Sequence, residues 1–588
     1  MSLLIVTGCS KRVDITLPIA LHEGQGAGEV RYQEESSPQP TTAHVVFDRA
    51  WGGVLSAAGR HADRATISLT LHMTNNATAT LGPLRIYHQG GLRKTLYEGD
   101  LASVASRSGY TVTPMDSGFI NVTRDRNSSP IRVSVHELPN STFYSPWLIL
   151  MIVILIGLIV LVVEVRGPTP RVPLIRLVVY GSVFIAIAVK GLYYAHTLSF
   201  PHGPDEHCHV AYVAHLVESG DLHPDYKQFV TFNAWGTRSE THCHLHHPPF
   251  YYHLMRLFAP DTVTGVLANV GNFRITNLVL SLAGISLFLW IGCRHDLPLW
   301  FHVAYAVTLA SVPMVPYLAA AVNNDNLGWL AGALSVFGAC LLLAEPIRRG
   351  GWTFLAGGLF LALAAKLTTS IHVAVFALIV VGVRIRRDSG FACLRPFGWP
   401  ATMIVCLIPI GYYIYAYVEF DTLFPARGPK TYRPENFRHV FFLEYVWIFL
   451  SHITLFWTGI LSQHSVLKEH WWEHIPLLFP IVMAVVALVY PWRVKGTGAI
   501  VLYDVARCAV AATLVFLFIH FLKMHSGNAK SGYIGGQQAR YYFALMPATL
   551  AAAYFPFLRC MTNPTVMIGL TIMLVSIVIM GYFHAFPM

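Results

Sequence analysis

Long apolar runs constrain this chain more than any other feature. Residues 147–165 contain almost no polar side chains, and runs of similar character follow at 177–198, 275–291, 297–317 and 327–344. A run of about twenty apolar residues is long enough to cross a bilayer as a helix. The mean hydropathy of +0.50 and the charged fraction of 12% extend this character to the whole chain. The sequence therefore predicts a polytopic membrane protein.

The second half of the chain adds further spans. Two shorter runs, 352–365 and 370–383, form a hairpin with Lys366 at its tip, and a last run covers 565–583. Four more runs begin near Pro400, Ile475, Val501 and Tyr541. We therefore expect a mainly α-helical bundle of about twelve transmembrane helices.

Arginines at the ends of the runs predict the orientation. Arg166, Arg171 and Arg176 follow the first run, and Arg294 and Arg348 follow later ones. Connections rich in Lys and Arg stay in the cytoplasm. The net charge of +10 therefore orients spans and does not indicate a nucleic-acid partner. We expect a multi-pass protein of the cell (inner, plasma) membrane that faces outward at both termini.

Three parts follow from this orientation. Residues 1–145 form an extracytoplasmic domain, 146–176 the first transmembrane helix with its cytoplasmic linker, and 177–588 the main transmembrane domain. The outer loops of that domain are 199–274, 419–474 and 524–540, where an aromatic-rich segment of the second loop lies on the outer leaflet.

The N-terminal part has the pattern of strands. Apolar and polar residues alternate at 67–73 and 131–135, with turn sequences between such segments. These features predict a β-sandwich. Residues 1–9 are similar to the end of a lipoprotein signal with Cys9 as the lipidated residue, and an ordinary first strand is the alternative.

A polar loop inside this apolar chain is the place where chemistry is expected. It contains the adjacent carboxylates Asp205 and Glu206 after Gly203-Pro204. We expect Asp205 in the first turn of an outer helix, where the helix dipole favours its charged form. A carboxylate held in that form suits a general base, and a helix cap is the alternative.

The same outer loop carries imidazoles and two cysteines. Cys208 and Cys243 could form a disulfide outside the cytoplasm. A divalent metal, zinc or manganese, is a second hypothesis, since imidazoles and carboxylates are suitable ligands. Its candidate ligands are His207, His209, His244 and His246. Hydrogen-bonded or solvated histidines are the alternative, and no cofactor is otherwise indicated.

Three further charges lie near the ends of spans. Arg540 follows a glycine pair where an outer loop meets an apolar run, and its guanidinium suits a phosphate. An interfacial arginine that extends to water is the alternative. Lys366 pairs with an anion or lies at the outer interface, since its charge is costly in hydrocarbon. Asp325 either binds an acceptor or caps the following span.

In this order, these motifs resemble the GT-C superfamily of membrane glycosyltransferases. They resemble more closely a bacterial family of multi-spanning proteins named domain of unknown function 2142. The motifs are Pro204-Asp205-Glu206 with His209, His247-Pro248-Pro249-Phe250-Tyr251-Tyr252, Asn324-Asp325, Lys366 and Gln538-Ala539-Arg540-Tyr541. The resemblance covers residues 177–588, and Ala539 and Phe250 replace the glycine and leucine expected there.

The resemblance implies transfer of a sugar from a polyprenyl-phosphate-linked donor to a glycan, lipid or protein acceptor in the cell envelope. Asp205 and Glu206 become the candidate catalytic residues, with Asp205 as the base and polyprenyl phosphate as the leaving group. Arg540 and Lys366 would stabilise the phosphate charge. The remaining expected substrate-binding residues are His209, His247, Tyr251, Asp325, Gln538 and Tyr541.

Two other classes of function remain open from the sequence. A transporter or flippase for a lipid-linked glycan also uses many spans and buried charges, and it predicts interrupted spans in two similar halves. A non-catalytic envelope assembly protein would act through its β-domain. It predicts that substitution of Asp205 leaves sugar transfer unchanged.

Overall fold

The computed structural model describes the strands between residues 12 and 135 and most of the chain from 173 to 576. In the second part it describes 173–197, 200, 203–222, 231–232, 238–239, 247–259, 266, 269–345, 350–387, 398–421, 423, 438–458, 475–489, 497–532, 534, 538–559, 565, 568–574 and 576. The possible lipidation site Cys9 and the first predicted span, 147–165, lie outside the described residues, so both stay predictions.

Eleven strands are described in the N-terminal part. They are β1 (Arg12–Glu23), β2 (Gly26–Glu34), β3 (Thr41–Phe47), β4 (Gly52–Arg60), β5 (Ala65–Met73), β6 (Thr78–Leu81), β7 (Leu84–Gln89), β8 (Lys94–Gly99), β9 (Tyr110–Pro114), β10 (Ile120–Arg124) and β11 (Ile131–Val135). One sheet has the order β8-β7-β1-β6-β10-β9 with β4 also on β1, and the other has the order β11-β5-β2-β3. The two segments in which apolar and polar residues alternate, 67–73 and 131–135, lie in β5 and β11. These strands pair antiparallel, with Ile131 opposite Leu71 and Val135 opposite Ile67. That the two sheets form a sandwich stays a prediction.

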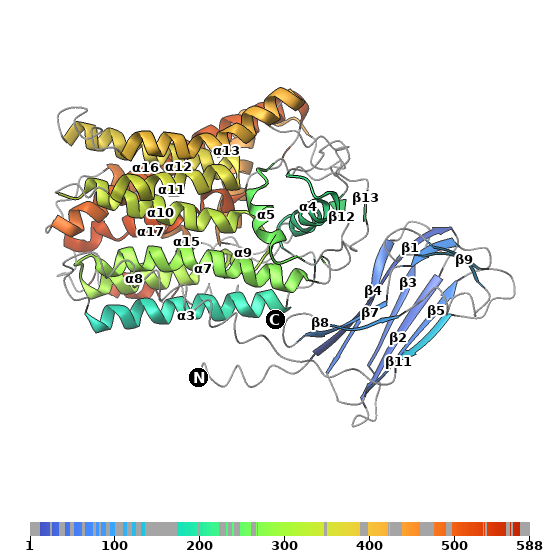
Figure 1. Ribbon diagram of the computed structural model, residues 1–588. Coiled ribbons are helices and arrows are strands. Elements are labelled where there is room, and N and C mark those ends of the chain that lie inside the picture. Colours follow the sequence, from blue (N-terminus) through green and yellow to red (C-terminus); the bar gives the residue numbers. More distant parts are fainter. Residues whose placement is uncertain are drawn as a thin grey trace.

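The rest of the described chain is almost entirely helical (Figure 1). In order it contains α3 (Leu174–Thr197), α4 (Glu206–Ser219), β12 (Thr231–Phe232), β13 (Arg238–Ser239), α5 (Phe250–Arg256), α7 (Val270–Arg294), α8 (Leu299–Ser311), α9 (Met314–Ala319), α10 (Asp325–Leu343), α11 (Gly350–Ala365), α12 (Leu367–Arg387), α13 (Gly398–Phe420), α14 (Phe442–Thr458), α15 (Ile475–Val489), α16 (Thr497–Ser531), η4 (Ala539–Tyr542), α17 (Met546–Ala552) and η5 (Phe555–Arg559).

Five of the described helices are long and apolar enough to cross a membrane. They are α3, α7, α10, α12 and α16. Shorter apolar helices include α8, α11 and segments of α14, α15 and α17. The chain is therefore a mainly α-helical, multi-pass membrane protein, as its apolar runs predicted. The total of about twelve spans stays a prediction.

Two predicted spans have a different form in the structure. The run 297–317 is divided into α8 and α9 at Val312-Pro313, because a residue that precedes proline disfavours the helical conformation. The run that starts near Tyr541 begins as the 3₁₀ turn η4 and continues as the short α17. In addition, α16 continues to Ser531 and so occupies the first half of the predicted outer loop 524–540.

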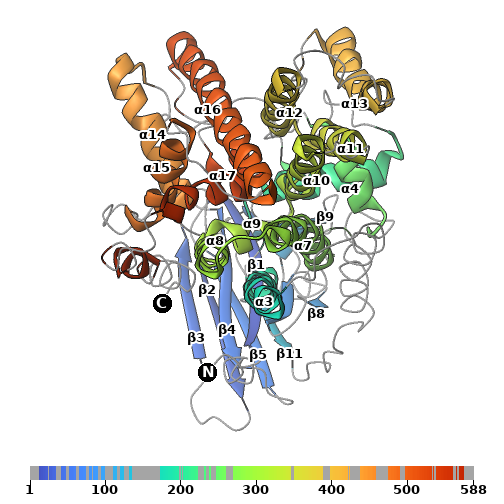
Figure 2. The same ribbon diagram turned by 90° about the vertical axis from the view of Figure 1, so that its left-hand side faces the viewer.

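The bundle is arranged around α7 and α10. Most of the apolar stretch of each is buried, 72% in α7 and 78% in α10, whereas only 22% is buried in α3. In Figure 2 both lie inside the bundle and α3 lies at its edge. The large apolar side chains that α3, α13 and α14 expose, such as Ile185, Val418 and Trp447, are what lipid-facing surfaces require.

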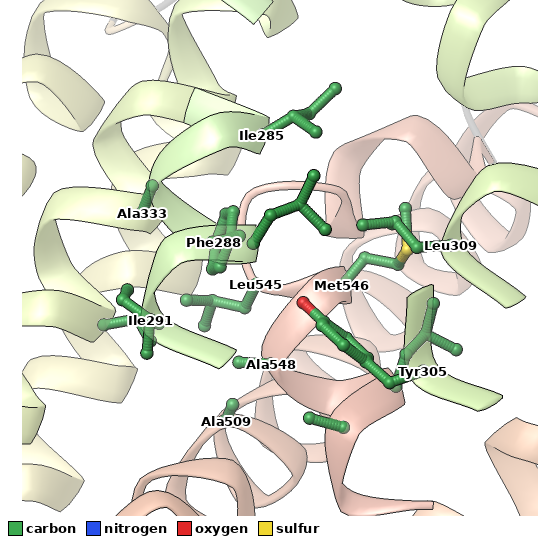
Figure 3. Packing of buried hydrophobic residues seen from close by; sticks show 14 of the residues in the cluster. Ile285, Phe288, Ile291, Tyr305, Leu309, Ala333, Ala509, Leu545, Met546 and Ala548 are labelled. Atoms are coloured by element: carbon green, nitrogen blue, oxygen red, sulfur yellow. The ribbon is translucent and has the colours of Figure 1, made fainter. Parts of the chain in front are cut away.

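The core joins segments that are far apart in the sequence. Figure 3 shows Ile285 and Phe288 of α7, Tyr305 of α8, Ala333 of α10 and Met546 of α17 in one cluster of buried residues. The residues between η4 and α17 lie against the N-terminal half of α10, where the rings of Phe543 and Trp329 are 5.4 Å apart. The position of η4 determines where Arg540 lies in the candidate site.

Candidate functional site

The site is built at one end of the bundle, where the apolar helices end. There α3 leads through Phe200 into α4, α10 begins at Asp325, and Lys366 separates α11 from α12. Figure 1 shows α4 and α5 at this end. The 3₁₀ turn η4 brings Arg540 to the same place. Four segments that are distant in the sequence therefore contribute charged side chains to one cluster.

Asp205 and Arg540 are in direct contact. The Nη2 atom of Arg540 donates a hydrogen bond of 2.5 Å to Oδ2 of Asp205. The side chain of Arg540 is 5% exposed, and that of Asp205 is 33% exposed. The contact joins two residues that are 335 positions apart in the sequence. Their chemical roles stay predictions.

Asp205 does not act as a helix cap. It occupies the N-cap position of α4, but its side chain makes no capping hydrogen bond. Its φ of 54° lies in the left-handed region, which is uncommon for a residue with a side chain. Strain of this kind is found where a structure over-determines a residue, often at functional sites. The left-handed backbone accompanies a carboxylate directed at Arg540.

The cluster continues from Arg540 to Lys366. Nε of Arg540 lies 3.3 Å from Oδ2 of Asp325. Nζ of Lys366 donates to both oxygens of Asp325, at 2.9 and 3.2 Å. The Tyr541 ring lies under both cations, 4.4 Å from Lys366 Nζ and 5.8 Å from Cζ of Arg540. Such contacts between a cation and a ring face are favourable. The cluster contains two acids and two bases and is therefore electrically neutral.

Burial and charge act on Asp205 in opposite directions. Burial raises the pKa of this carboxyl, but the charge of Arg540 and its hydrogen bond lower the pKa more, with smaller contributions from His209 and Lys366. The net pKa lies well below its usual range, so Asp205 is ionised at neutral pH. Conversely, burial would lower the pKa of Arg540, and Asp205 and Asp325 raise it above its usual value. Both partners keep their charges.

Glu206, the second candidate catalytic residue, has a different environment from Asp205. It is completely buried, with Arg274 Nε 2.7 Å from Oε1 and Arg274 Nη2 2.6 Å from Oε2. The backbone amides of Val322 and Gly203 donate to the same carboxylate at 3.2 and 3.3 Å. All four donors are directed at a carboxylate with no exposed surface, so its contacts are structural, and a catalytic role stays a prediction. Glu206 fixes the start of α4 to α7 and to the turn before α10.

The expected substrate-binding residues His209, His247 and Tyr251 are also buried. His209 shares a hydrogen bond of 2.9 Å between Nδ1 and the Tyr252 hydroxyl, and its ring stacks with that of His247 at 6.2 Å. Tyr251 donates to Asn277 Oδ1 at 2.8 Å. Burial lowers the pKa of His209 well below its usual range, although Asp205 acts in the opposite sense, so the ring is neutral. These groups form a buried cluster next to Asp205, and their expected role in substrate binding stays a prediction.

Asparagines that the sequence did not single out hold the site together. Asn277 Oδ1 accepts hydrogen bonds from Tyr251 and, at 3.0 Å, from Asn326. Asn323 Nδ2 donates to the carbonyl of Pro204 at 3.0 Å, and Asn323 Oδ1 accepts from the amide of Asp325 at 2.8 Å. Asn323 therefore connects Pro204, which precedes Asp205, with Asp325 of the charge cluster. The polar run 323–326 directly before an apolar run was the available signal.

Arg274 was missed as well. In the sequence it resembles an arginine at a membrane interface, because it lies at the edge of an apolar run. Only the fold shows that its side chain is 2% exposed and paired with Glu206. Gln538 lies two residues before Arg540, and its Oε1 atom is buried with no hydrogen-bond partner in the described part of the chain.

Within the described residues, no three His, Cys, Asp or Glu side chains lie together as metal ligands would. His207 and His209 are described, whereas His244 and His246 are not. Cys208 is in a disulfide bond, and Cys243 lies outside the described residues, so this pairing stays a prediction.

Fold and site define a polytopic α-helical membrane protein with a buried charge cluster at one end of its bundle. No family model matches the chain, and no curated protein matches it. Among solved structures it is similar to ArnT from Cupriavidus metallidurans in the apo state, with 15% identity and a TM-score of 0.31. That match covers 70% of this chain and 77% of the other. A likeness of this degree indicates nothing about the activity.

Proposed function

We propose that the chain is a membrane glycosyltransferase. It moves a sugar from a polyprenyl-phosphate-linked donor to an acceptor hydroxyl at the extracytoplasmic face, in the assembly or modification of a cell-envelope glycan. The observation that carries this proposal is the contact between Asp205 and Arg540 beside the Asp325–Lys366 pair. A partly exposed carboxylate next to two fixed cations supplies a base for a hydroxyl and an electrostatic site for a phosphate.

The roles follow from exposure. Asp205 is the base, since it is ionised and 33% exposed. Arg540 binds the donor phosphate, and Lys366 adds positive charge below it. Asp325, 2% exposed, orients both cations. Gln538 and Tyr541, each partly buried, lie where they can contact the donor next to Arg540.

Charge placement supports the proposed sidedness. Arg294 ends α7, and Arg384, Arg386 and Arg387 lie in the last turn of α12. Both helices start at the site end of the bundle, so these arginines mark the opposite end. If arginine-rich ends remain in the cytoplasm, the site faces outward. Lipid-linked donors and membrane lipids are accessible there without a nucleotide-binding fold.

The test is sugar transfer by the full chain in proteoliposomes that contain candidate polyprenyl-phosphate sugars. Asp205→Asn should lower the transfer rate by about 10²-fold or more, the usual contribution of a general base. Asp221→Asn is the matched control, since it alters an exposed acid just beyond the other end of α4. Equal rates in Asp205→Asn and wild type would remove the proposal for the base.

The same liposomes separate the alternatives. A transporter or flippase would move a labelled donor lipid across the bilayer without forming a glycosylated product. An assembly protein would do neither, and Asp205→Asn would change only complex formation in the envelope.

A further inference from the structure

The two acidic partners of Arg540 are held unequally. Asp325 is 2% exposed and is also bound by Lys366 through both oxygens. Asp205 is 33% exposed, and within the described residues its side chain has no hydrogen bond other than that from Arg540. A contact between a buried and a partly exposed group exchanges more readily than one between two buried groups. Asp205 is therefore the partner that can be displaced.

Arg540 has donors to spare for another anion. Its Nη1 atom is buried and has no hydrogen-bond partner in the described part of the protein, and Nε faces Asp325 without hydrogen-bond geometry. A guanidinium binds phosphate best through two N–H groups at once. A buried donor without an acceptor is costly. A phosphate oxygen on Nη1 would remove that cost, and a second oxygen on Nη2 would take the place of Asp205.

We propose that the Asp205–Arg540 ion pair is a resting contact that the donor phosphate displaces, so that donor binding itself releases the carboxylate for the acceptor hydroxyl. This inference rests on the proposed function. Before binding, Arg540 neutralises Asp205 and weakens it as a base. After binding, the phosphate occupies the guanidinium, and Asp205 adjoins an extra negative charge that makes it a stronger proton acceptor.

The step balances in atoms and charge. The acceptor oxygen forms a bond to the anomeric carbon as the bond from that carbon to the phosphate oxygen breaks. The electron pair of the broken bond stays on the phosphate, which changes from a monoanion to a dianion. The hydroxyl proton goes to Asp205, which becomes neutral. Arg540 and Lys366 retain the dianion until polyprenyl phosphate leaves. Asp205, which is 33% exposed, then releases its proton to solvent water and returns as a carboxylate to Arg540.

The test uses farnesyl methyl phosphate, a monoanionic phosphodiester with a lipid tail and no sugar. Its Kd is measured by calorimetry on the detergent-solubilised full chain for wild type, Asp205→Asn, Arg540→Gln and the double variant. Removing the competing carboxylate should tighten binding about tenfold, equivalent to about 1.4 kcal/mol. In the Arg540→Gln background the same change should alter Kd by less than about twofold, because there is no guanidinium to compete for.

Two results would overturn the exchange. One is an unchanged or weaker affinity in Asp205→Asn. The other is the same tightening in both backgrounds, which would indicate a general effect of charge. Because the probe carries no sugar, either result leaves the transfer assay intact as the test of the proposed function. Absence of probe binding by wild type would remove both the exchange and the donor assignment. Size-exclusion profiles identify variants that fail to fold.

Discussion

Replacement of Glu206 by glutamine should destabilise the protein strongly, because Arg274 would keep a buried charge without its partner. Both side chains are no more than 2% exposed. The carboxylate accepts from Nε and Nη2 of Arg274 and from the amides of Val322 and Gly203. Glutamine keeps one acceptor oxygen and turns an NH₂ group toward donors. Loss of one partner of a buried pair costs about 3–5 kcal/mol.

The assay is thermal unfolding of the purified full chain in detergent. The expected fall in Tm for Glu206→Gln is at least about 5 °C, given about 2–4 °C for each kcal/mol in larger domains. The double variant Glu206→Gln, Arg274→Met should recover part of that loss, because it also removes the unpaired charge. Recovery would assign the defect to the orphaned guanidinium.

The pH dependence of stability gives a second measurement on the same pair. Burial raises the pKa of Glu206, but Arg274 and the backbone donors lower it more, so its folded pKa lies below the ordinary value. A depressed carboxyl pKa contributes stability above the unfolded pKa of about 4.3, and this stability is lost as the pH falls through the folded value. The gap in Tm between wild type and Glu206→Gln should therefore narrow below about pH 4.

Either of two results would contradict this account of Glu206. If Glu206→Gln unfolds at the wild-type temperature but no longer transfers sugar, the carboxylate acts in the reaction and its pairing with Arg274 is not its role. A gap in Tm that stays constant from neutral to acidic pH would also contradict the linkage.

Two further substitutions test the charge cluster and the position of η4. Lys366→Met should lower kcat at saturating donor about 10²-fold, because it removes a fixed positive charge near the leaving phosphate; an unchanged kcat would exclude Lys366 from the reaction. Gly332→Ala should lower both Tm and transfer, because its Cβ would lie 1.6 Å from the carbonyl oxygen of Ala544, four residues after Arg540. Gly357→Ala is the matched control, because its Cβ would have no atom within 4 Å. It should leave transfer unchanged and leave Tm unchanged or slightly higher. Equal effects of Gly332→Ala and Gly357→Ala would contradict the packing argument.

Much of the helical framework could be predicted from local sequence. The helices α3, α7 and α10 lie where apolar runs of sufficient length predicted them, and α12 extends the shorter predicted run 370–383 at both ends. Lys366 lies between α11 and α12, as the short hairpin required. The reason is that a helix which satisfies its own backbone groups needs only an adequate apolar length to cross hydrocarbon. The position of Pro313 also contained the signal for the break between α8 and α9.

The site could be predicted only in part. The shared sidedness of the loops predicted that Asp205 and Arg540 lie together, and the two side chains are in contact. The same reasoning treated the adjacent Glu206 as a second catalytic candidate and treated His209 and Tyr251 as substrate-binding residues. It could not predict that these side chains are buried, because burial depends on which side chains other segments place opposite, and neighbouring residues at the start of α4 face different partners.

The membrane class follows from the order of residues alone, because hydrophobic length acts locally along the chain. Tertiary structure alone decided the pairing: Glu206 with Arg274, Asp325 with Lys366, and Asp205 with Arg540. Each pair joins segments at least 41 positions apart. Which acid stays exposed enough to react depends on the packing of α4, α7, α10 and η4 against one another, and this packing has no local signature.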